Sequence, residues 1–380
     1  MTDTGPAVRP GPPPAPGPIR KWWLGARPRT LPAALVPVVV GTAAAHPLHH
    51  VALVVLHSVA SAPDTPVASA QGVTHSVIAD GPSAYGSRVT VRFPQHGPAG
   101  FWWRALGALV VALAIQVGTN YANDYSDGIR GTDDARVGPV RLTDTGLASP
   151  AAVKRAALLA FAVAAVVGLA LAVATSWWIL LVGAACLLAG WFYTGGPRPY
   201  GYAGLGEVFV FVFFGLVATV GTFYVETERL DRPAVWWAAV AVGLLATALL
   251  LANNLRDIAS DIESGKRTLA VRVGRRTGGW CYVACVGAPF VGVALWGLLA
   301  VPGVIHSLLP VLGFLPLLAL PLARPPVQVA LSPAEGRALL PVLAATGRLQ
   351  LAFGALLAVA LWSTLTPLVS TWPSLPGLSG

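Results

Sequence analysis

Successive apolar stretches, each long enough to cross a lipid bilayer, constrain this chain more than any other feature of its sequence. A membrane-spanning α-helix needs about 20 mostly apolar residues. Inside a bilayer, backbone N–H and C=O groups must find partners within the protein, which favours helices over open sheets. The sequence therefore predicts an all-α fold, a multi-pass membrane helical bundle with about nine transmembrane helices. These spans are expected at residues 22–45, 101–122, 152–174, 177–194, 203–224, 235–254, 278–300, 303–322 and 350–370.

The composition supports lipid as the main solvent of the chain. Hydrophobic residues make up 55% of the sequence and charged residues only 11%, whereas a soluble domain carries about 25% charged residues. The net charge is +9, but the basic residues alternate with apolar runs instead of forming an aromatic-rich basic patch. This arrangement indicates membrane topology and no nucleic-acid partner. The three cysteines lie in apolar stretches, so we expect packing roles and neither disulfides nor a zinc site.

The distribution of charge predicts which side of the membrane each loop faces. With nine spans, one set of loops, taken together with the adjoining helix ends, carries 20 of the 25 Lys and Arg residues and 11 of the 16 acidic residues. The positive-inside rule places that set in the cytoplasm of a bacterial cell, beneath the plasma membrane. Tryptophan pairs at four expected helix starts are typical of interfacial anchors. These pairs are Trp22-Trp23, Trp102-Trp103, Trp177-Trp178 and Trp236-Trp237.

The chain divides into a tail and one large domain. Residues 1–21 begin with a Pro- and Gly-rich stretch without an apolar core, which predicts a disordered cytoplasmic tail and no secretory signal. Residues 22–375 form a single transmembrane domain. Within it, residues 46–100 are expected to be an extended extracytoplasmic insert, apolar at first and then rich in Ser, Ala, Pro and scattered His. No carboxylate or cysteine completes a metal site with these histidines.

Two polar segments at the ends of expected helices share one spacing of residues. Asn123 precedes Asp127 by four positions, and Asn253 precedes Asp257 by four, with Asp261 four further on. Spacing of four places side chains on one helix face, about a turn apart. Carboxylates at that spacing repel each other unless a cation lies between them. For a single acid, solvated surface charge is the favoured interpretation, but two matched motifs beside apolar helices indicate a functional site.

Clusters of oxygen ligands suit Mg²⁺, which proteins usually hold with one or two carboxylates plus substrate phosphates. Two such clusters facing each other could clamp one diphosphate through bridging Mg²⁺. The remaining phosphate oxygens would then be neutralised by Lys266, Arg267 and either Arg130 or Arg136.

The sequence at this point resembles the UbiA superfamily of intramembrane prenyltransferases, and within it the menaquinone-type branch. The stretches that carry the resemblance are RPRTLPAALVPVVVGT (27–42), QVGTNYANDYSDGIRGTDD (116–134), GWFYTGGPRPYGYAGLGEVFVFVFFG (190–215) and NNLRDIASDIESGKRTLAVRVG (253–274). The resemblance implies a helical bundle around a central cavity, with Mg²⁺ bridging both aspartate motifs to a prenyl diphosphate. Many members of the superfamily have Asp at the position of Gly131, and Asp133 follows two residues later. The menaquinone-type branch resembles this version, which leaves open whether Asp133 or Asp134 binds metal.

The residues and the resemblance together predict the following site. The expected metal ligands are Asn123, Asp124, Asp127, Asp257 and Asp261. The expected catalytic residues are Asp127, Asp257 and Lys266. The expected substrate-binding residues are Asn123, Arg130, Arg136, Tyr193, Arg198, Lys266 and Arg267.

Several of these roles have alternatives. Arg198 is expected to contact the diphosphate or the acceptor's carboxylate, and Tyr193 to line the acceptor pocket, unless either is an interfacial anchor. Glu207 opens a helix, where an acid is also favoured electrostatically, so a structural role competes with acceptor binding. Arg27 and Arg29 either reach the site or serve membrane topology alone.

The resemblance implies transfer of a polyprenyl group from polyprenyl diphosphate to 1,4-dihydroxy-2-naphthoate. Carbon dioxide and diphosphate are lost, and a demethylmenaquinol of menaquinone biosynthesis is formed. One alternative is a prenyltransferase for another aromatic acceptor, such as 4-hydroxybenzoate. A different class is a cation-coupled transporter, although transporter sites usually lie near the bilayer midplane. A non-catalytic scaffold leaves the paired motifs unexplained. Prenyl length and oligomeric state stay open.

Overall fold

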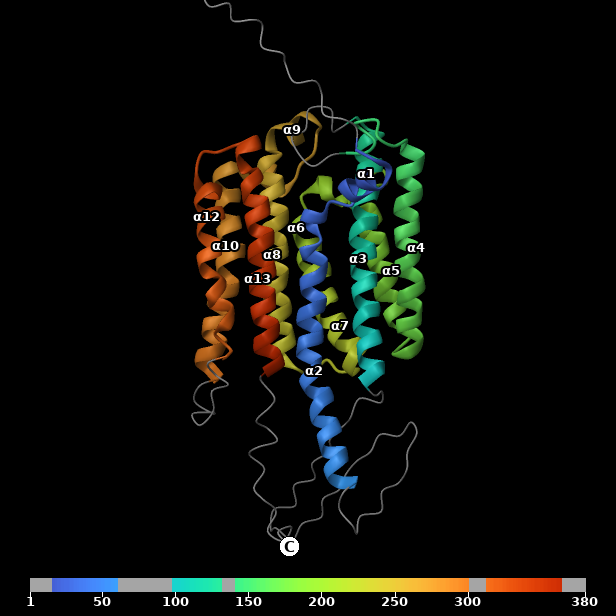
Figure 1. Ribbon diagram of the computed structural model, residues 1–380. Helices are drawn as coiled ribbons and strands as arrows, with labels where there is room; N and C mark the ends of the chain where they lie inside the picture. Colours follow the sequence, from blue (N-terminus) through green and yellow to red (C-terminus); the bar gives the residue numbers. More distant parts are fainter. Residues whose placement is uncertain (1–15, 61–97, 132–140, 301–311, 364–380) are drawn as a thin grey trace, which may run out of the picture.

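The computed structural model describes residues 16–60, 98–131, 141–300 and 312–363. Within this part, every regular element is a helix, and the long helices stand side by side as a bundle (Figure 1). The long elements are α2 (Pro32–Ala60), α3 (Pro98–Gly128), α4 (Pro150–Ala174), α5 (Ile179–Phe192), α8 (Pro233–Arg256), α10 (Leu269–Ala300), α12 (Leu320–Leu331) and α13 (Leu340–Ser363). One further segment consists of α6 (Gly206–Val210), the π-helix η3 (Phe211–Val217) and α7 (Ala218–Thr227). Short elements are α1 (Pro18–Gly25), η1 (Pro28–Thr30), η2 (Tyr200–Ala203), α9 (Ile258–Glu263), η5 (Leu315–Ala319) and η6 (Gly336–Leu339).

The all-α membrane bundle is confirmed. Among the described residues, six helices are long and apolar enough to cross a membrane, or seven if a bent pair counts as one span. That pair, Pro18–Thr30 with Pro32–His46, is bent by 59°. Two shorter apolar helices, Ile179–Phe192 and Leu315–Leu331, lie beside them. The count of nine stays a prediction.

The first expected span, 22–45, is divided in the structure. Trp22 and Trp23 lie in the short helix α1, and α2 begins only at Pro32. Between them Arg27 adopts a left-handed backbone conformation with φ 53°, and Pro28 and Pro32 lack the N–H groups that a continuous helix needs.

The expected extracytoplasmic insert is helical in its first part, because α2 continues to Ala60. Residues 61–97, like residues 1–15 of the expected tail, lie outside the described part.

Two helices near the C-terminus differ from the expected spans 303–322 and 350–370. The helical segment that corresponds to the expected span 303–322 runs from Leu315 to Leu331, and α13 begins at Leu340. The expected span ended at residue 322 because the sequence becomes more polar there. The helix itself continues to Leu331, where tertiary contacts support its end. Arg275 of α10 donates to the carbonyl oxygens of Ala330 (2.7 Å) and Ser332 (3.1 Å), which satisfies acceptors at the end of α12.

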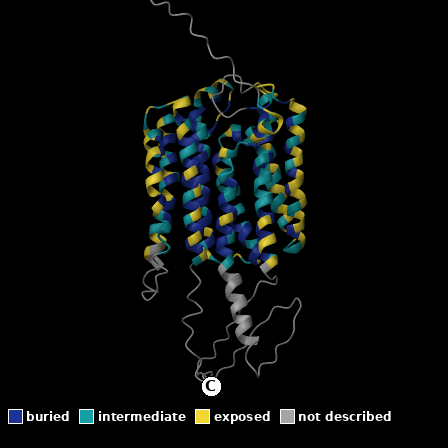
Figure 2. Ribbon diagram, in the orientation of Figure 1, coloured by how far each residue is buried: buried dark blue, intermediate teal, exposed yellow. Residues whose placement is uncertain are grey.

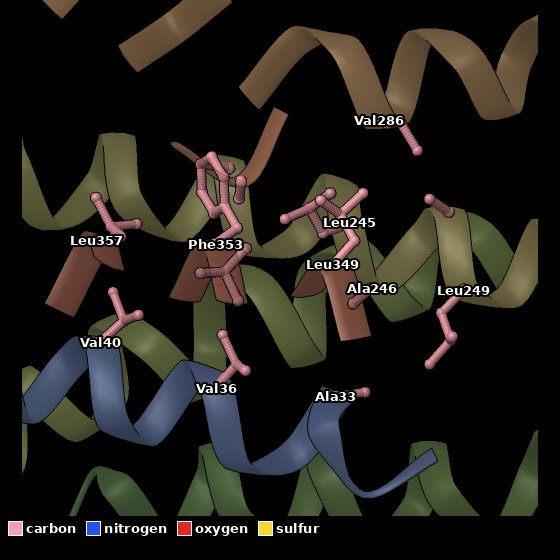
Figure 3. Close-up of a cluster of buried hydrophobic side chains, with 14 of the residues drawn as sticks. Ala33, Val36, Val40, Leu245, Ala246, Leu249, Val286, Leu349, Phe353 and Leu357 are labelled. Carbon is pink, nitrogen blue, oxygen red and sulfur yellow. The ribbon is translucent and has the colours of Figure 1, made fainter. Parts of the chain in front are cut away.

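Side-chain burial separates a packed interior from a lipid-facing surface (Figure 2). Helices α2, α8, α10 and α13 share a hydrophobic core in which Val40, Leu245 and Phe353 are fully buried (Figure 3). Leu181 of α5 and Val166 of α4, by contrast, are 76% and 70% exposed. Apolar exposure on this scale is typical of a surface covered by lipid.

The helices form two groups, which meet where α3 contacts α2 and α7. Helices α3, α4 and α5 pack on one another, while α2, α7, α8, α10, α12 and α13 pack together on the other side. η3 joins the second group through a close contact in which a Cβ on Gly215 would lie 2.5 Å from the Cα of Gly243. This division leaves room for a cavity inside the bundle.

Candidate active site

A cavity of about 820 Å³ lies between the two groups of helices. Its wall comes from the α1–α2 connection, from α2 to α5, from the α6–α7 segment and from α8. One end is polar and includes Asn123, Asp127 and Asp261, whereas the body is apolar, with residues such as Phe213 and Leu171. A polar head with a long apolar chain would match both regions.

A stripe of buried polar residues on α3 leads into the polar end. The stripe consists of Gln116, Asn120, Asn123 and Asp127, each at most 7% exposed. Their spacing of three or four residues keeps them on one helix face. Asn120 Nδ2 donates to Ala26 O (2.9 Å) and to Thr30 Oγ1 (3.1 Å), and Gln116 Nε2 also donates to Thr30 Oγ1 (3.1 Å). The inner half of the stripe therefore fixes the α1–α2 connection, while Asn123 and Asp127 face the cavity.

Asp127 is the most heavily engaged acid at the polar end. Its Oδ1 accepts hydrogen bonds from the Tyr202 hydroxyl (2.6 Å) and from Lys266 Nζ (3.4 Å). Its Oδ2 accepts one from Arg141 Nη2 (3.0 Å). Lys266 and Arg141 have side chains only 7% exposed, so two buried cations face this carboxylate. Such an excess of positive charge favours binding of an anion.

The neighbouring acid Asp124 holds the chain that carries Arg141. Its two oxygens accept the backbone N–H groups of Leu142 (2.7 Å) and Thr143 (3.0 Å), and it is 1% exposed. Asp124 does not belong to the cavity wall. Its expected role as a metal ligand stays a prediction, and its observed contacts are positioning contacts.

The second motif lies where α8 ends and α9 begins. Asp257 is non-helical at this break (φ −95°, ψ 6°) and forms a two-pronged pair with Arg256, with both N···O distances 2.6 Å. The cavity wall includes Arg256 and Asp261 but not Asp257. Asp261 accepts from Thr268 Oγ1 (3.4 Å), and its backbone oxygen accepts from Lys266 N (2.8 Å). This turn brings Lys266 into the site.

Tyr202 connects the two motifs through the α5–α6 loop. Its hydroxyl contacts Asp127, its ring lies 4.8 Å from Lys266 Nζ, and its backbone oxygen accepts from Arg267 N at 2.9 Å. Arg130 Cζ also lies over this ring, 5.5 Å from its centroid. A cation near an aromatic face is stabilised electrostatically, so Tyr202 helps to place both basic residues.

Of the other residues predicted to bind substrate, some line the cavity and others do not. Tyr193 lines the cavity, as expected. Arg198 and Arg267 are exposed and outside the cavity wall. Arg130 is also exposed, and it donates to the carbonyl oxygens of Thr194 and Gly196.

Arg136, Asp133 and Asp134 lie outside the described residues. Their predicted contacts therefore stay predictions.

Sequence reasoning missed several residues of the polar end. Arg141 and Tyr202 contact Asp127 directly, and Thr194 Oγ1 donates to Asn123 Oδ1 at 2.7 Å. Tyr202 stood within the PRPYGY stretch, whose turn residues signalled a rigid loop. No spacing rule pointed to Arg141, because it follows a long loop.

Tyr200, a neighbour in the same loop, lines the cavity as a neutral donor. Burial raises the pKa of its hydroxyl, so it stays protonated and donates to Ala189 O at 2.8 Å.

The donor set fits a hard divalent cation. Asn123, Asp127, Asn253 and Asp261 offer amide and carboxylate oxygens to one cavity, which suits Mg²⁺. Among the described residues, no group of three or more His, Cys, Asp and Glu side chains forms a preassembled metal site. Proteins usually hold Mg²⁺ with few carboxylates and substrate phosphates, so the two observations agree.

Comparison with known proteins places the chain. A model of the UbiA prenyltransferase family matches residues 93–329. The Mycobacterium tuberculosis protein named 1,4-dihydroxy-2-naphthoate octaprenyltransferase is 42% identical over 351 residues, covering 90% of this chain and 96% of that protein. The Escherichia coli protein of the same name is 39% identical over 240 residues, covering 60% of this chain and 75% of that protein.

The fold also matches a solved structure, that of a UbiA homologue from Archaeoglobus fulgidus bound to GPP and Mg²⁺. The TM-score is 0.53 with 16% sequence identity, over 90% of this chain and 99% of that one. At this identity the likeness concerns the fold alone. The resemblance expected from the motifs is thereby confirmed, and the chain belongs to the UbiA prenyltransferase family.

Proposed function

We propose that this chain transfers a polyprenyl group from polyprenyl diphosphate to 1,4-dihydroxy-2-naphthoate in menaquinone biosynthesis. The reaction depends on Mg²⁺, releases CO₂ and diphosphate, and forms a demethylmenaquinol. The carrying observation is the cavity of about 820 Å³, with Asp127, Asp261, Arg141 and Lys266 at its polar end and an apolar body. The names of the Mycobacterium tuberculosis and Escherichia coli relatives support the choice of acceptor.

The cation site draws on Asn123, Asp127 and Asp261, which line the cavity. When bound, Mg²⁺ stabilises the negative charge that develops on the departing diphosphate. Asp124 and Asp257 were expected as further ligands. We assign them to positioning instead, because their oxygens engage backbone N–H groups and Arg256 and because neither lines the cavity.

The basic residues change partners when substrate arrives. In the structure, Arg141 and Lys266 neutralise Asp127. A diphosphate offers both cations several new acceptor oxygens and releases Asp127 for the metal. Charge-assisted hydrogen bonds to a diphosphate are stronger than neutral ones, and they strengthen as the leaving group gains charge. Lys266 therefore acts in catalysis and Arg141 joins it in substrate binding.

The apolar body of the cavity holds the prenyl chain away from water. Ionisation of the allylic C–O bond leaves a carbocation-like prenyl group, and exclusion of water protects it from hydrolysis. The ring carbon that bears the carboxylate attacks this group, and the electron pair of the lost carboxylate restores the ring as CO₂ departs. Tyr193 lines the region expected to hold the acceptor.

The far end of the cavity is held together by polar contacts. Trp178 Nε1 donates to the Tyr224 hydroxyl (3.1 Å), joining α5 to α7. Arg104 Nη1 donates to Val225 O (2.7 Å). Because these contacts link the helices at this end, we expect a prenyl chain too long for the cavity to leave sideways, toward lipid.

The charge distribution supports a plasma-membrane location with the active site facing the cytoplasm, because the motif loops belong to the set with 20 of 25 basic residues. Another aromatic acceptor, such as 4-hydroxybenzoate, is the second candidate within the family. A cation-coupled transporter fits less well, since Asp127 and Asp261 lie at helix ends beside buried cations.

The test is a competition between acceptors. The purified chain receives polyprenyl diphosphate, Mg²⁺ and equal amounts of dihydroxynaphthoate and 4-hydroxybenzoate, and products are separated by chromatography. We expect prenylated naphthoquinol only, and none when EDTA removes Mg²⁺. Preference for 4-hydroxybenzoate would overturn the acceptor, and product formation in EDTA would overturn the metal requirement.

A further inference from the structure

Glu207 is a buried acid outside the cavity wall. It lies in the first turn of α6 and is 5% exposed. Burial of a carboxylate in the membrane region is costly, and residues kept there commonly have a functional reason. The sequence left its role open between structure and acceptor binding. Because Glu207 does not line the cavity, contact with the acceptor does not explain it.

The carboxylate of Glu207 instead contacts a residue that does line the cavity. Its Oε1 accepts a hydrogen bond of 2.8 Å from Nδ2 of Asn254. An ionised carboxylate only accepts hydrogen bonds. In its ionised form Glu207 therefore requires the Asn254 amide to present its nitrogen, as it does in this hydrogen bond, and Oδ1 of Asn254 points the other way.

The adjacent Asn253 is oriented by the same rule. Its Nδ2 donates to the backbone oxygen of Leu249 (3.3 Å), which also only accepts. Both amides thus commit their nitrogens within the protein, and both residues line the cavity that contains Asp127 and Asp261. Amide oxygens in such a place are suitable ligands for a hard cation.

Only one of the two carboxylate oxygens of Glu207 takes part in this contact. Oε2 of Glu207 is buried without a hydrogen-bond partner among the described residues. A tie between α6 and α8 alone would not need a carboxylate, since a glutamine could make the same bond. A carboxylate adds something a glutamine lacks: it excludes the flipped orientation of the partner amide.

We propose that Glu207 is a positioning residue that fixes the amide of Asn254, so that Asn254 Oδ1 serves as a ligand for the divalent cation bound with the diphosphate. This inference rests on the proposed function for the presence of the cation. It adds Asn254 to the cation site. It also gives Glu207 a role, which is to orient Asn254 without binding the cation itself.

The test measures Mg²⁺ binding by calorimetry, on the full chain with farnesyl diphosphate and without acceptor. Glu207→Met removes the carboxylate that accepts the hydrogen bond from Asn254. This change should weaken Mg²⁺ binding by about 10- to 100-fold, the usual effect of losing the hydrogen-bond partner of a metal ligand. Glu207→Gln keeps a neutral partner and should cause a smaller loss. Asn254→Asp sets two carboxylates against each other and should weaken binding at least as much as Glu207→Met.

A double variant separates orientation from simple packing. In Glu207→Gln with Asn254→Asp, the introduced glutamine donates to the introduced aspartate, whose second oxygen faces the cavity. Mg²⁺ binding should recover by at least about tenfold over Asn254→Asp alone. A purely structural contact predicts no such rescue of metal affinity.

Thr247→Val is the matched control on the same helix pair. Thr247 Oγ1 donates to Gly243 O (2.9 Å) and lies 3.5 Å from Glu207 O, outside the cavity wall. Its loss should leave Mg²⁺ affinity unchanged. Unchanged affinity in Glu207→Met, or no recovery in the double variant, would overturn the inference. If the wild-type chain binds Mg²⁺ with the diphosphate but prenylates neither acceptor, the proposed function fails and this inference stands.

Discussion

The two aspartate motifs share a spacing in sequence but differ in how the fold uses them. Helix α3 continues through the first motif to Gly128, so Asn123 and Asp127 lie on one face and both line the cavity. Helix α8 ends at Arg256, and Asp257 occupies the break before α9. Asp257 therefore pairs with Arg256, and Asp261 reaches the cavity in its place. Equal spacing gives equal geometry only while the helix continues.

The comparison also shows a division of labour within each motif. One acid faces the cavity and another holds the surrounding chain: Asp127 and Asp124 in the first motif, Asp261 and Asp257 in the second. Variants can separate the two kinds of acid, because loss of a cation ligand and loss of a positioning contact affect different measurements.

The largest effect is expected for Asp127→Asn. This change preserves shape but removes the charge that two cations and Tyr202 contact. We expect prenyl transfer to fall by about a thousandfold, comparable with the loss of a major electrostatic group in other active sites. Initial rates at saturating Mg²⁺ measure it, with a melting curve to show that the chain is folded. If the rate of prenyl transfer by Asp127→Asn is within tenfold of the wild-type rate, Asp127 is not a ligand of the cation.

Asp257→Asn should affect stability more than chemistry. It leaves Arg256 buried, with its side chain 1% exposed, beside a neutral amide. Breaking a buried pair in this way costs about 3–5 kcal/mol, so the melting temperature should fall clearly.

The matched control is the double variant with Arg256→Met, which removes both charges and should recover part of the loss. A stable Asp257→Asn chain with a large increase in the Mg²⁺ requirement would make Asp257 a ligand after all, and the two motifs would be equivalent.

Tyr202→Phe tests the residue that joins the motifs. The ring stays beneath Lys266, but the 2.6 Å hydrogen bond to Asp127 is lost. A hydrogen bond to a charged group contributes about 1.5–3 kcal/mol, so we expect kcat/KM to fall by about 10- to 100-fold. Tyr202→Leu, which removes the ring as well, should be worse. Equal rates for both variants would show that the ring does not position Lys266.

The smallest effect is expected far from both motifs, at the exposed pair of Arg229 and Asp231, whose N···O distance is 2.7 Å. Exposed ion pairs contribute about 0–1 kcal/mol. Arg229→Ala should therefore leave prenyl transfer unchanged and shift the melting temperature little. A loss of activity comparable with that of Tyr202→Phe would mean that the far end of the bundle takes part in the reaction.

Much of this architecture follows from local sequence. Long apolar runs specify helices in a membrane, and acids beside them mark the site, so the fold class and the cavity-facing Asp127, Asp261 and Lys266 were predictable. Other features depend on contacts that no spacing encodes. Arg141 is placed by Asp124 through the backbone of the next two residues.

The break at Asp257 illustrates the remaining limit. The residues from Asn253 to Asp261 read as one helical face, but α8 ends at Arg256, and Asp257 is non-helical at the break and pairs with Arg256. The orientation of Asn254 likewise depends on Glu207, 47 positions away in sequence. Periodicity describes one helix at a time and carries no information on such pairs.

The most direct test of the account is the mass of the product that the purified chain forms from polyprenyl diphosphate, 1,4-dihydroxy-2-naphthoate and Mg²⁺. The account predicts a naphthoquinol that has gained one prenyl group and lost its carboxyl group, with equal amounts of CO₂ and diphosphate released. A prenylated product that retains the carboxyl group, or the absence of any prenylated product from a folded chain, would contradict it.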